Sequence, residues 1–180
     1  MNSSSAPVTQ PFRDEHVEIK KHLGHMGGMI GSIATAPSSE AGNLMEKLVG
    51  ALRSHILPHA EWEERVLYPV VDRIVGGKVL FTAAMRHEHE IVGRQIELLA
   101  SQAENPTRDG VLFARTADQL LGLILAHFED EEEVLLPILD ANMTAEQFER
   151  EILSKGSPHG GSDRSRARTA GVKTSGRDRQ

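Results

Sequence analysis

The chain has 180 residues, of which 39% are hydrophobic but only 4% aromatic, and it carries a net charge of −6. This length suffices for one domain with a sizeable core, and the aliphatic composition favours packed helices over sheets. The absence of cysteine excludes disulfides, iron–sulfur clusters, thiolate zinc sites and cysteine nucleophiles, so any metal must bind through nitrogen and oxygen.

The charge is unevenly distributed along the chain. Residues 155–180 carry a net charge of +5, which leaves about −11 on the remainder. A strongly acidic body argues against nucleic acid as a partner. The N-terminal sequence lacks the pattern of a secretory signal, and the longest apolar stretch, LLGLILA, is too short to span a bilayer. We therefore expect a cytoplasmic protein without a membrane partner.

Hydrophobic periodicity and turn residues predict a first pair of long helices. The first helix spans residues 12–33 and ends before the turn sequence ATAPSS. The second helix starts at a cap on Ser38 or Ser39, is interrupted by Pro58, and stops before Gly76.

The same signals predict a second pair of long helices. The third helix spans residues 79–103, and the fourth runs from a cap at Thr107 to about Asp140. Thr144 and Gln147 have the spacing of a capping box and predict a short fifth helix.

We therefore expect an all-α fold, a four-helix up-down bundle with a short fifth helix. The predicted organisation is a flexible N-terminus at residues 1–11, one domain at 12–153, and a disordered basic tail at 154–180 that has almost no apolar content. An inert, solvated tail is the favoured interpretation, and contact with nucleic acid or an acidic partner is the alternative.

Alternating spacings of three and four residues give each predicted helix an inward-facing apolar stripe. Polar residues interrupt each stripe once, at His16 in the first helix, His59 and Glu63 in the second, His89 in the third, and His127 and Glu131 in the fourth. In the second and fourth helices the apolar stripe resumes at Val66 and Val134.

The interruptions belong to an internal repeat. The sequence HAEWEERVLYP at 59–69 is echoed by HFEDEEEVLLP at 127–137, and the dipeptide Glu15-His16 is matched by Glu88-His89. The chain therefore consists of two similar helical hairpins. Because the polar positions of each hairpin have similar separations, six polar side chains can meet at one level of the bundle.

Burying six such groups without partners would be costly. An unpartnered carboxylate in an apolar core costs several kcal/mol, and an unpartnered imidazole costs roughly 1 to 3 kcal/mol. Together they would cancel most of a typical stability of about 5–15 kcal/mol. A single histidine–glutamate pair could satisfy itself, but four histidines and two glutamates in register indicate a metal site.

The donor set restricts the metal. Four imidazoles and two carboxylates suit iron, manganese or zinc, and they are too many for one tetrahedral zinc. If Glu63 and Glu131 each bridge two ions, octahedral coordination leaves about two open positions per ion. Two divalent ions exceed the charge of two glutamates, so an anionic oxo or hydroxo bridge is expected beside a small ligand such as oxygen, peroxide or nitric oxide.

The pattern His, HxxxE, His, HxxxE on four helices resembles the hemerythrin-like (HHE) family of non-haem di-iron proteins over residues 12–140. The motifs that carry the resemblance are EH near a helix start and HxxxEExxLxP. The resemblance implies two iron ions (Fe2+/Fe3+) with an oxo or hydroxo bridge. It implies as ligands His16, His59, Glu63, His89, His127 and Glu131.

The chain departs from the oxygen-carrying members of that family. Those carriers have an HxxxH pair that ends at the position of His89, whereas this chain has Met85 at the partner position. They also use an aspartate five residues after the last histidine, where this chain has Glu132, and Glu131 lies at four. The resemblance is therefore closer to members linked to peroxide, nitric oxide or iron handling.

Several nearby residues allow two interpretations. His55 lies one turn before His59 and could be an orienting partner, a gate, an extra ligand or filler. Glu64 and Glu132 could orient the ligands or bind metal, but a solvated face is the favoured interpretation. Tyr68 and Trp62 are more readily explained by packing.

We thus predict a di-iron protein that binds or reacts with a small oxidant, with peroxide or reactive-nitrogen handling favoured over transport. Catalase-like or nitric-oxide-handling turnover would make it an enzyme involved in oxidative stress. The alternatives are a redox or oxygen sensor without turnover, a regulatory binding protein with an unknown protein partner, and oxygen or iron storage. A metal-free structural bundle is the least favoured interpretation. A ferritin-like di-iron bundle is the nearest rival, but it is disfavoured because the Glu-x-x-His spacing that it needs on two helices does not occur.

Overall fold

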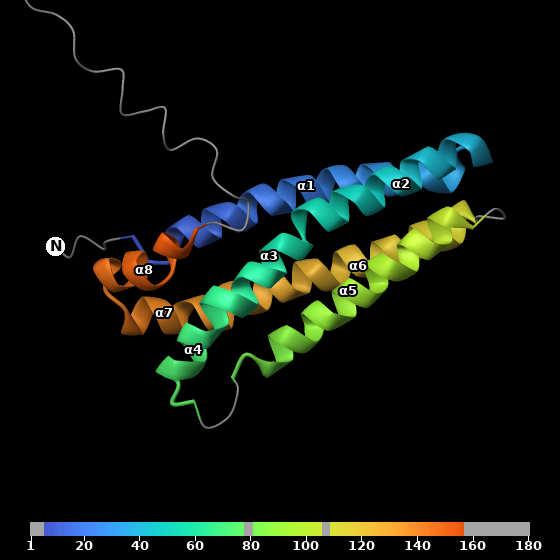
Figure 1. Cartoon of the computed structure of the whole chain (residues 1–180). Helices are drawn as coiled ribbons and strands as arrows, with labels where there is room; N and C mark the ends of the chain where they lie inside the picture. Colours follow the sequence, from blue (N-terminus) through green and yellow to red (C-terminus); the bar gives the residue numbers. More distant parts are fainter. Residues whose placement is uncertain (1–5, 78–80, 106–108, 157–180) are drawn as a thin grey trace, which may run out of the picture.

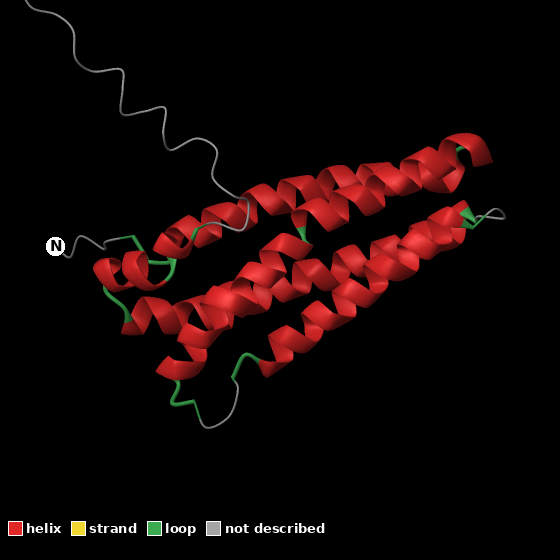
Figure 2. Cartoon of the chain, in the orientation of Figure 1, coloured by secondary structure: helices red, strands yellow, loops and turns green. Residues whose placement is uncertain are grey.

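The structure, a computed structural model, describes residues 6–77, 81–105 and 109–156, and these residues form helices without any strand (Figure 1, Figure 2). The second and fourth bundle helices are each divided by a π-helical segment, η1 or η2. The first bundle helix is α1 (Gln10–Thr35). The second comprises α2 (Ser38–His55), α3 (Leu57–Trp62), η1 (Glu63–Leu67) and α4 (Tyr68–Ile74). The third is α5 (Ala83–Glu104). The fourth comprises α6 (Gly110–Asp130), η2 (Glu131–Leu135) and α7 (Leu136–Asn142), and it is followed by α8 (Ala145–Glu151) and a 3-10 turn at Leu153–Lys155.

The four long helices form a closed ring of neighbours. Helix α1 packs beside α2 and α6, and α5 packs beside the same two helices. Successive helices run in opposite directions, and α7 and α8 lie near the start of α1 (Figure 1). The predicted all-α, four-helix up-down bundle with a short fifth helix is confirmed.

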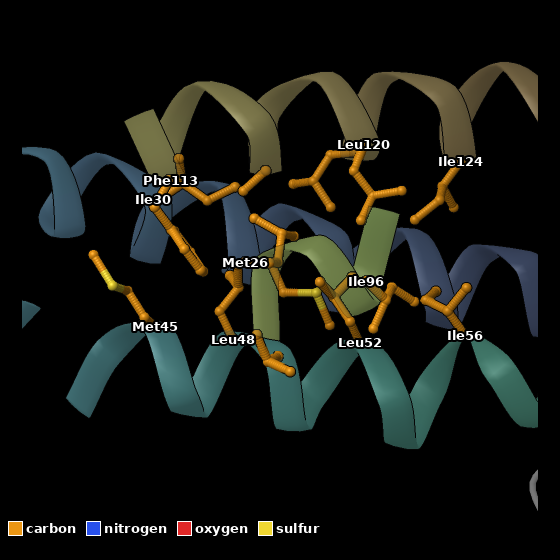
Figure 3. Packing of buried hydrophobic residues seen from close by; sticks show 14 of the residues in the cluster. Met26, Ile30, Met45, Leu48, Leu52, Ile56, Ile96, Phe113, Leu120 and Ile124 are labelled. Carbon is orange, nitrogen blue, oxygen red and sulfur yellow. The ribbon is translucent and has the colours of Figure 1, made fainter. Parts of the chain in front are cut away.

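The apolar core is divided into two clusters. The larger cluster fills the half of the bundle built by α2, α6 and the C-terminal parts of α1 and α5, where residues such as Met26, Leu52 and Leu120 interdigitate (Figure 3). The smaller cluster is richer in aromatic side chains and gathers around α4, α7 and α8. In each bundle helix, the predicted polar positions lie at the boundary between the two clusters.

Two helix starts differ from the prediction. Helix α2 begins at Ser38, directly after Pro37, without a side-chain cap, so the prediction of a cap on Ser38 or Ser39 was wrong. Helix α6 is capped by Asp109, whose side chain accepts hydrogen bonds from the N–H groups of the second and third helical residues. The predicted cap Thr107 lies outside the described residues.

The third bundle helix starts at Ala83 rather than at residue 79, since residues 81 and 82 form a turn, whereas three other predicted features are confirmed. Thr144 and Gln147 form the predicted capping box, in which each side chain bonds the other residue's backbone N–H. After α4, Gly76 and Gly77 take φ angles of 100° and 64°, which side chains with a Cβ rarely adopt. The second bundle helix is interrupted between α2 and α3, beside Pro58.

The two π-helical segments begin at the glutamates of the HxxxE repeats. Each wide turn adds one residue, which shifts the next inward position by one. In η1 this position is Leu67 instead of the predicted Val66, and in η2 it is Leu135 instead of the predicted Val134. Val134 is 50% exposed, whereas Leu135 is 1% exposed, and the prediction that Val134 lies inward was therefore wrong.

A proline explains each wide turn. Pro69 and Pro137 follow the two π-helical segments and have no N–H to donate within an α-helix. A proline ring would also clash with the carbonyl four residues earlier in a regular α-helix. The extra residue in the preceding turn relieves this conflict, and the helix continues.

The internal repeat also appears in long-range polar contacts. Asp140 accepts hydrogen bonds from the backbone N–H and the hydroxyl of Thr9, both at 3.0 Å. Asp72, at the equivalent place in the first hairpin, accepts the same two bonds from Thr82, also at 3.0 Å. These contacts join α1 to the fourth bundle helix and α5 to the second. The two hairpins are therefore related by an approximate two-fold axis.

The folded unit extends beyond the predicted boundary on the N-terminal side. Residues 9–11 were predicted to be flexible, yet Thr9 is fully buried and α1 begins at Gln10. Of the predicted tail, residues 154–156 are described, and the rest lies outside the described residues.

One described helix is long and apolar enough to cross a membrane by length and composition. It spans Gly110–Asn142, and half of its most apolar window is buried inside the bundle. Core helices of proteins without membrane spans have the same length and composition. The finding is compatible with the packed bundle described here.

Candidate metal centre

The structure brings all six predicted ligand side chains together where the two apolar clusters meet. Five of them are at most 4% exposed, and the side chain of His89 is 7% exposed. They come from α1 (His16), the second bundle helix (His59, Glu63), α5 (His89) and the fourth bundle helix (His127, Glu131).

Glu63 lies at the centre of this cluster. Its Oε1 is 2.7 Å from His59 Nε2, and its Oε2 is 3.2 Å from His89 Nε2. The donor atoms form two groups, within each of which all atoms lie within 4.8 Å of one another. The first position comprises His16, His59, Glu63 and Glu131, and the second position comprises Glu63, His89 and His127. Glu63 is shared, as expected of a residue that bridges two ions.

Helix geometry accounts for the convergence. His59 and Glu63 are four residues apart, so both face the interior from one side of the helix, and His127 and Glu131 repeat this arrangement. The π-helical segments start at the two glutamates, and wide turns of this kind occur often at functional sites.

A glutamate lies beside the outward nitrogen of each histidine. We call these four residues the outer glutamates; they are Glu15, Glu64, Glu88 and Glu132. The Nδ1 atoms lie 3.0 Å from Glu132 (His16), 3.0 Å from Glu64 (His89), 2.8 Å from Glu88 (His127) and 3.8 Å from Glu15 (His59). Because a carboxylate only accepts, the three close contacts place the proton on Nδ1 and leave Nε2 facing the centre.

These contacts run in one direction around the bundle. The histidine of α1 contacts a glutamate of the fourth bundle helix, and the histidine of the fourth helix contacts a glutamate of α5. In turn, the histidine of α5 contacts a glutamate of the second bundle helix, and the histidine of the second helix contacts a glutamate of α1. Each outer glutamate is the direct chain neighbour of a predicted ligand, so it points about 100° away, toward the adjacent helix. Glu64 and Glu132 keep some exposure, but both contact a predicted ligand, so the interpretation as a purely solvated face was wrong. The repeated EH and EE dipeptides carried the signal.

The six donors hold protons unequally when no metal is bound. Burial alone would lower the pKa of His59, but the charge of Glu63, the contact of its Nδ1–H with the Glu15 carboxylate and the charge of Glu131 raise it to about 10. Burial would raise the pKa of Glu63, but His59 and the other nearby imidazoles hold it well below its usual value. Burial and the charge of Glu63 raise the pKa of Glu131 well above its usual value. A metal ion must displace these protons.

Unsatisfied polar atoms in the cluster fit a pair of metal ions. Within the described part of the chain, His16 Nε2, Glu63 Oε2 and Glu131 Oε2 are buried and make no hydrogen bond of acceptable geometry. Leaving such atoms without partners is costly, and metal coordination would supply the partners. Imidazole nitrogen and carboxylate oxygen are the donors that iron, manganese and zinc use in proteins.

Tyr68 lies in the site, whereas the sequence interpretation favoured a packing role for it. Its hydroxyl donates a 2.8 Å hydrogen bond to Glu131 Oε1 and lies 3.3 Å from His89 Nε2 and 3.5 Å from His127 Nε2. Burial, Glu63 and Glu131 raise the pKa of Tyr68 far above its usual value, so the phenol holds its proton. As the chain's one tyrosine, directly before Pro69, it gave no spacing signal.

Two other residues with open interpretations lie outside the cluster of donors. The ring of His55 stacks on His22 with a centroid distance of 4.3 Å, on the α1–α2 face of the bundle. Trp62 is buried and stacks on Phe12, in agreement with the packing interpretation.

Comparison with known proteins agrees with this geometry. The hemerythrin HHE cation binding domain matches the chain over residues 8–139, a range that includes all six predicted ligands. Neither the search of curated proteins nor the search of solved structures found a match. The helical bundle, its cluster of histidines and glutamates, and a domain match over well over half of the chain lead to one conclusion. The chain belongs to the hemerythrin family, whose HHE domains bind metal cations.

Proposed function

We propose that the protein is a non-haem di-iron protein that binds or reacts with a small oxidant, and that peroxide or reactive nitrogen species are the preferred partners. The observation that carries this proposal is the pair of donor groups that share Glu63. Two positions that share a carboxylate suit two ions a short distance apart, and an oxo or hydroxo bridge would balance their charge.

The side chains of the site would have distinct tasks. Glu63, which both donor groups share, would hold the two ions together. Glu131 would bind at the first position, and the four histidines would bind through Nε2. The outer glutamates would hold the Nδ1 protons, and Tyr68 would keep a proton beside Glu131 Oε1. Two iron ions held by these residues would supply redox chemistry, in the form of one electron from each ion. The apolar clusters on both sides would limit access of water.

A second candidate function is a sensor that changes its contacts with a partner when its iron changes state. Deep burial of the site favours this candidate, because the predicted ligands are at most 7% exposed and substrate must pass through packed side chains. We place either function in the cytoplasm.

The first experiment is to measure metal content per chain by mass spectrometry after growth in iron-replete medium. About two irons per chain supports the di-iron proposal, and a folded protein without metal contradicts it.

Turnover then separates the two candidates. Loss of many equivalents of hydrogen peroxide or nitric oxide indicates an enzyme, and a stoichiometric spectral change indicates a sensor.

A variant tests the bridging assignment. Replacement of Glu63 by alanine removes the donor shared by both positions, so the paired site should be lost. A Glu63→Ala protein that kept both irons and full peroxide turnover would show that Glu63 is not the bridge.

A further inference from the structure

The approximate two-fold axis predicts two equivalent metal positions. It relates His16 to His89, His59 to His127, and Glu63 to Glu131, as the repeated sequences require. If the hairpins were identical, each position would have two histidines and both glutamates. In the structure, donor atoms that all lie within 4.8 Å of one another come from four residues at the first position and from three at the second, and Glu131 belongs only to the first group.

Tyr68 accounts for the missing donor. Its hydroxyl holds Glu131 Oε1 at 2.8 Å, while Glu131 Oε2 lies 3.4 Å from His16 Nε2 and 3.8 Å from His127 Nε2. The carboxylate is thus turned toward the first position. The repeat places Leu136 where the first hairpin has Tyr68, so no equivalent hydroxyl holds Glu63. Glu63 is free to contact histidines of both positions.

The side chains around the two positions also differ. The rings of Phe12 and Phe128 lie 4.7 Å and 4.5 Å from the ring of His16 and also contact His59, so they enclose the first position. The repeat places Met85 and Ala60 at the two equivalent places of the other hairpin. The second position instead has the ring of Tyr68 stacked on His89 at 5.5 Å and the ring of Phe128 at 6.0 Å from that of His127.

Exposure follows the same asymmetry. The side chain of His16 is fully buried, whereas that of its counterpart His89 is 7% exposed. The outer glutamate that holds His89, Glu64, is also the most exposed of the four, at 39%. The second position is therefore nearer to solvent.

We propose that the small ligand binds at the second position, formed by Glu63, His89 and His127, and that Tyr68 is the positioning residue that makes this position different from the first. This inference rests on the proposed di-iron function. Tyr68 acts through Glu131, which it turns away from the second position, and its hydroxyl also lies beside the place where the ligand would bind. Without this hydroxyl, Glu131 could turn into the place that the ligand would take.

The test is Mössbauer spectroscopy of protein loaded with isotopically enriched iron, with azide as the probe ligand. The wild-type protein should give two resolved iron environments in equal amounts, and azide should shift one of them. Tyr68→Phe keeps the ring but removes the hydroxyl, and Tyr68→Leu introduces the residue of the other hairpin. In both variants the two environments should become more alike, and azide should bind roughly tenfold more weakly.

The matched control is Leu136→Met, a volume-conserving change at the equivalent place of the other hairpin. It should leave both the spectrum and the azide affinity unchanged. Circular dichroism and iron content establish that each variant is folded and loaded. If Tyr68→Leu does not fold, the test depends on Tyr68→Phe, which keeps the buried ring.

Three results would overturn the inference. One is a single iron environment in the wild-type protein. The second is an unchanged difference between the irons in Tyr68→Phe. The third is a visible phenolate-to-iron absorption band that disappears in Tyr68→Phe, because Tyr68 would then be a fourth donor of the second position. In each case the protein still holds two irons, so the proposed di-iron function would stand.

Discussion

The imidazoles of the site owe their orientation to the outer glutamates. These carboxylates lie on the far side of each ring, and they add negative charge next to the proposed site of two cations. Each outer glutamate can be replaced while all six predicted ligands are kept. Their contribution can therefore be measured separately from that of the ligands.

Glu132→Gln should weaken metal binding roughly 10- to 100-fold, as is typical for carboxylates that support a metal-bound histidine. Glutamine keeps the shape and can still accept from His16 Nδ1, but it removes the charge. Competition with a chelator, with zinc as the probe, measures the change without redox chemistry.

The control for this prediction is Glu133→Gln. Glu133 is the next residue in the chain and is exposed, so the same change of charge should have little effect. Equal zinc affinities for the Glu132 and Glu133 variants would contradict the role of the outer glutamates.

The pKa of His59 predicts how metal binding depends on pH. In the folded chain without metal this pKa is about 10, compared with 6.5 for an ordinary histidine, so His59 carries a proton at neutral pH. That proton stabilises the metal-free fold below pH 6.5, and the contribution is lost as pH rises toward 10. Metal binding must expel it, so affinity should increase with pH.

Calorimetry of zinc binding in buffers with different ionisation enthalpies counts the released protons. We expect net release at pH 7, from His59 and from Glu131, whose pKa is raised. A binding enthalpy that does not depend on the buffer would show that the site holds no displaceable proton.

The contact between α1 and α6 sets a strict requirement at one glycine. A Cβ on Gly110 would lie 2.7 Å from the backbone carbonyl oxygen of Ile33, closer than such atoms approach. Gly110→Ala should therefore lower the free energy of unfolding by about 1–3 kcal/mol, because backbone rather than a flexible side chain would have to move.

Gly122→Ala is the matched control on the same helix. No heavy atom outside the local helix lies within 4 Å of the position of its added Cβ, and alanine is the better helix former by about 1 kcal/mol. Chemical denaturation should show opposite signs for the two variants. A stabilising Gly110→Ala would mean that the helices do not approach this closely.

The same helices show which features the sequence could predict. Spacings of three and four located all six inward polar residues, because apolar periodicity constrains a helix face strongly. The spacing failed at Val134, since a π-helical turn shifts every later residue by one position. Pro69 and Pro137, ten residues after the two histidines, were the visible sign of that shift. The cap at Asp109 was missed because Thr107 is an equally suitable residue type.

Tyr68 could not have been predicted in the same way. Its role depends on which atoms meet across three helices, and a single aromatic residue in an apolar stripe carries no periodic signal. The outer glutamates form an intermediate case. Their positions next to the predicted ligands were visible in the sequence, but which helix each one reaches depends on the order of helices around the bundle.

The complete bundle should depend on its metal for stability. The cluster occupies the layer between the two apolar clusters, and without metal its buried donor atoms lack adequate partners. A ligand that binds only the folded state adds about 2.7 kcal/mol when its free concentration is 100 times its Kd. Removing iron with a chelator should therefore lower the midpoint of thermal unfolding.

Glu63→Ala provides the comparison for metal removal. Its midpoint should not respond to added iron, because the shared donor is absent. If the wild-type protein unfolded at the same temperature with and without iron, the metal would not be bound preferentially by the folded state.

The exchange of contacts between the two hairpins has a consequence for the order of events during synthesis. Thr9 and His16, near the start of the chain, reach their partners Asp140 and Glu132 near the end of the fourth bundle helix. A nascent chain that has completed only its first hairpin holds His16, His59 and Glu63 but has no Glu131 to complete the first position. We therefore expect the metal to be captured after translation of the domain, by a finished bundle rather than by a growing one.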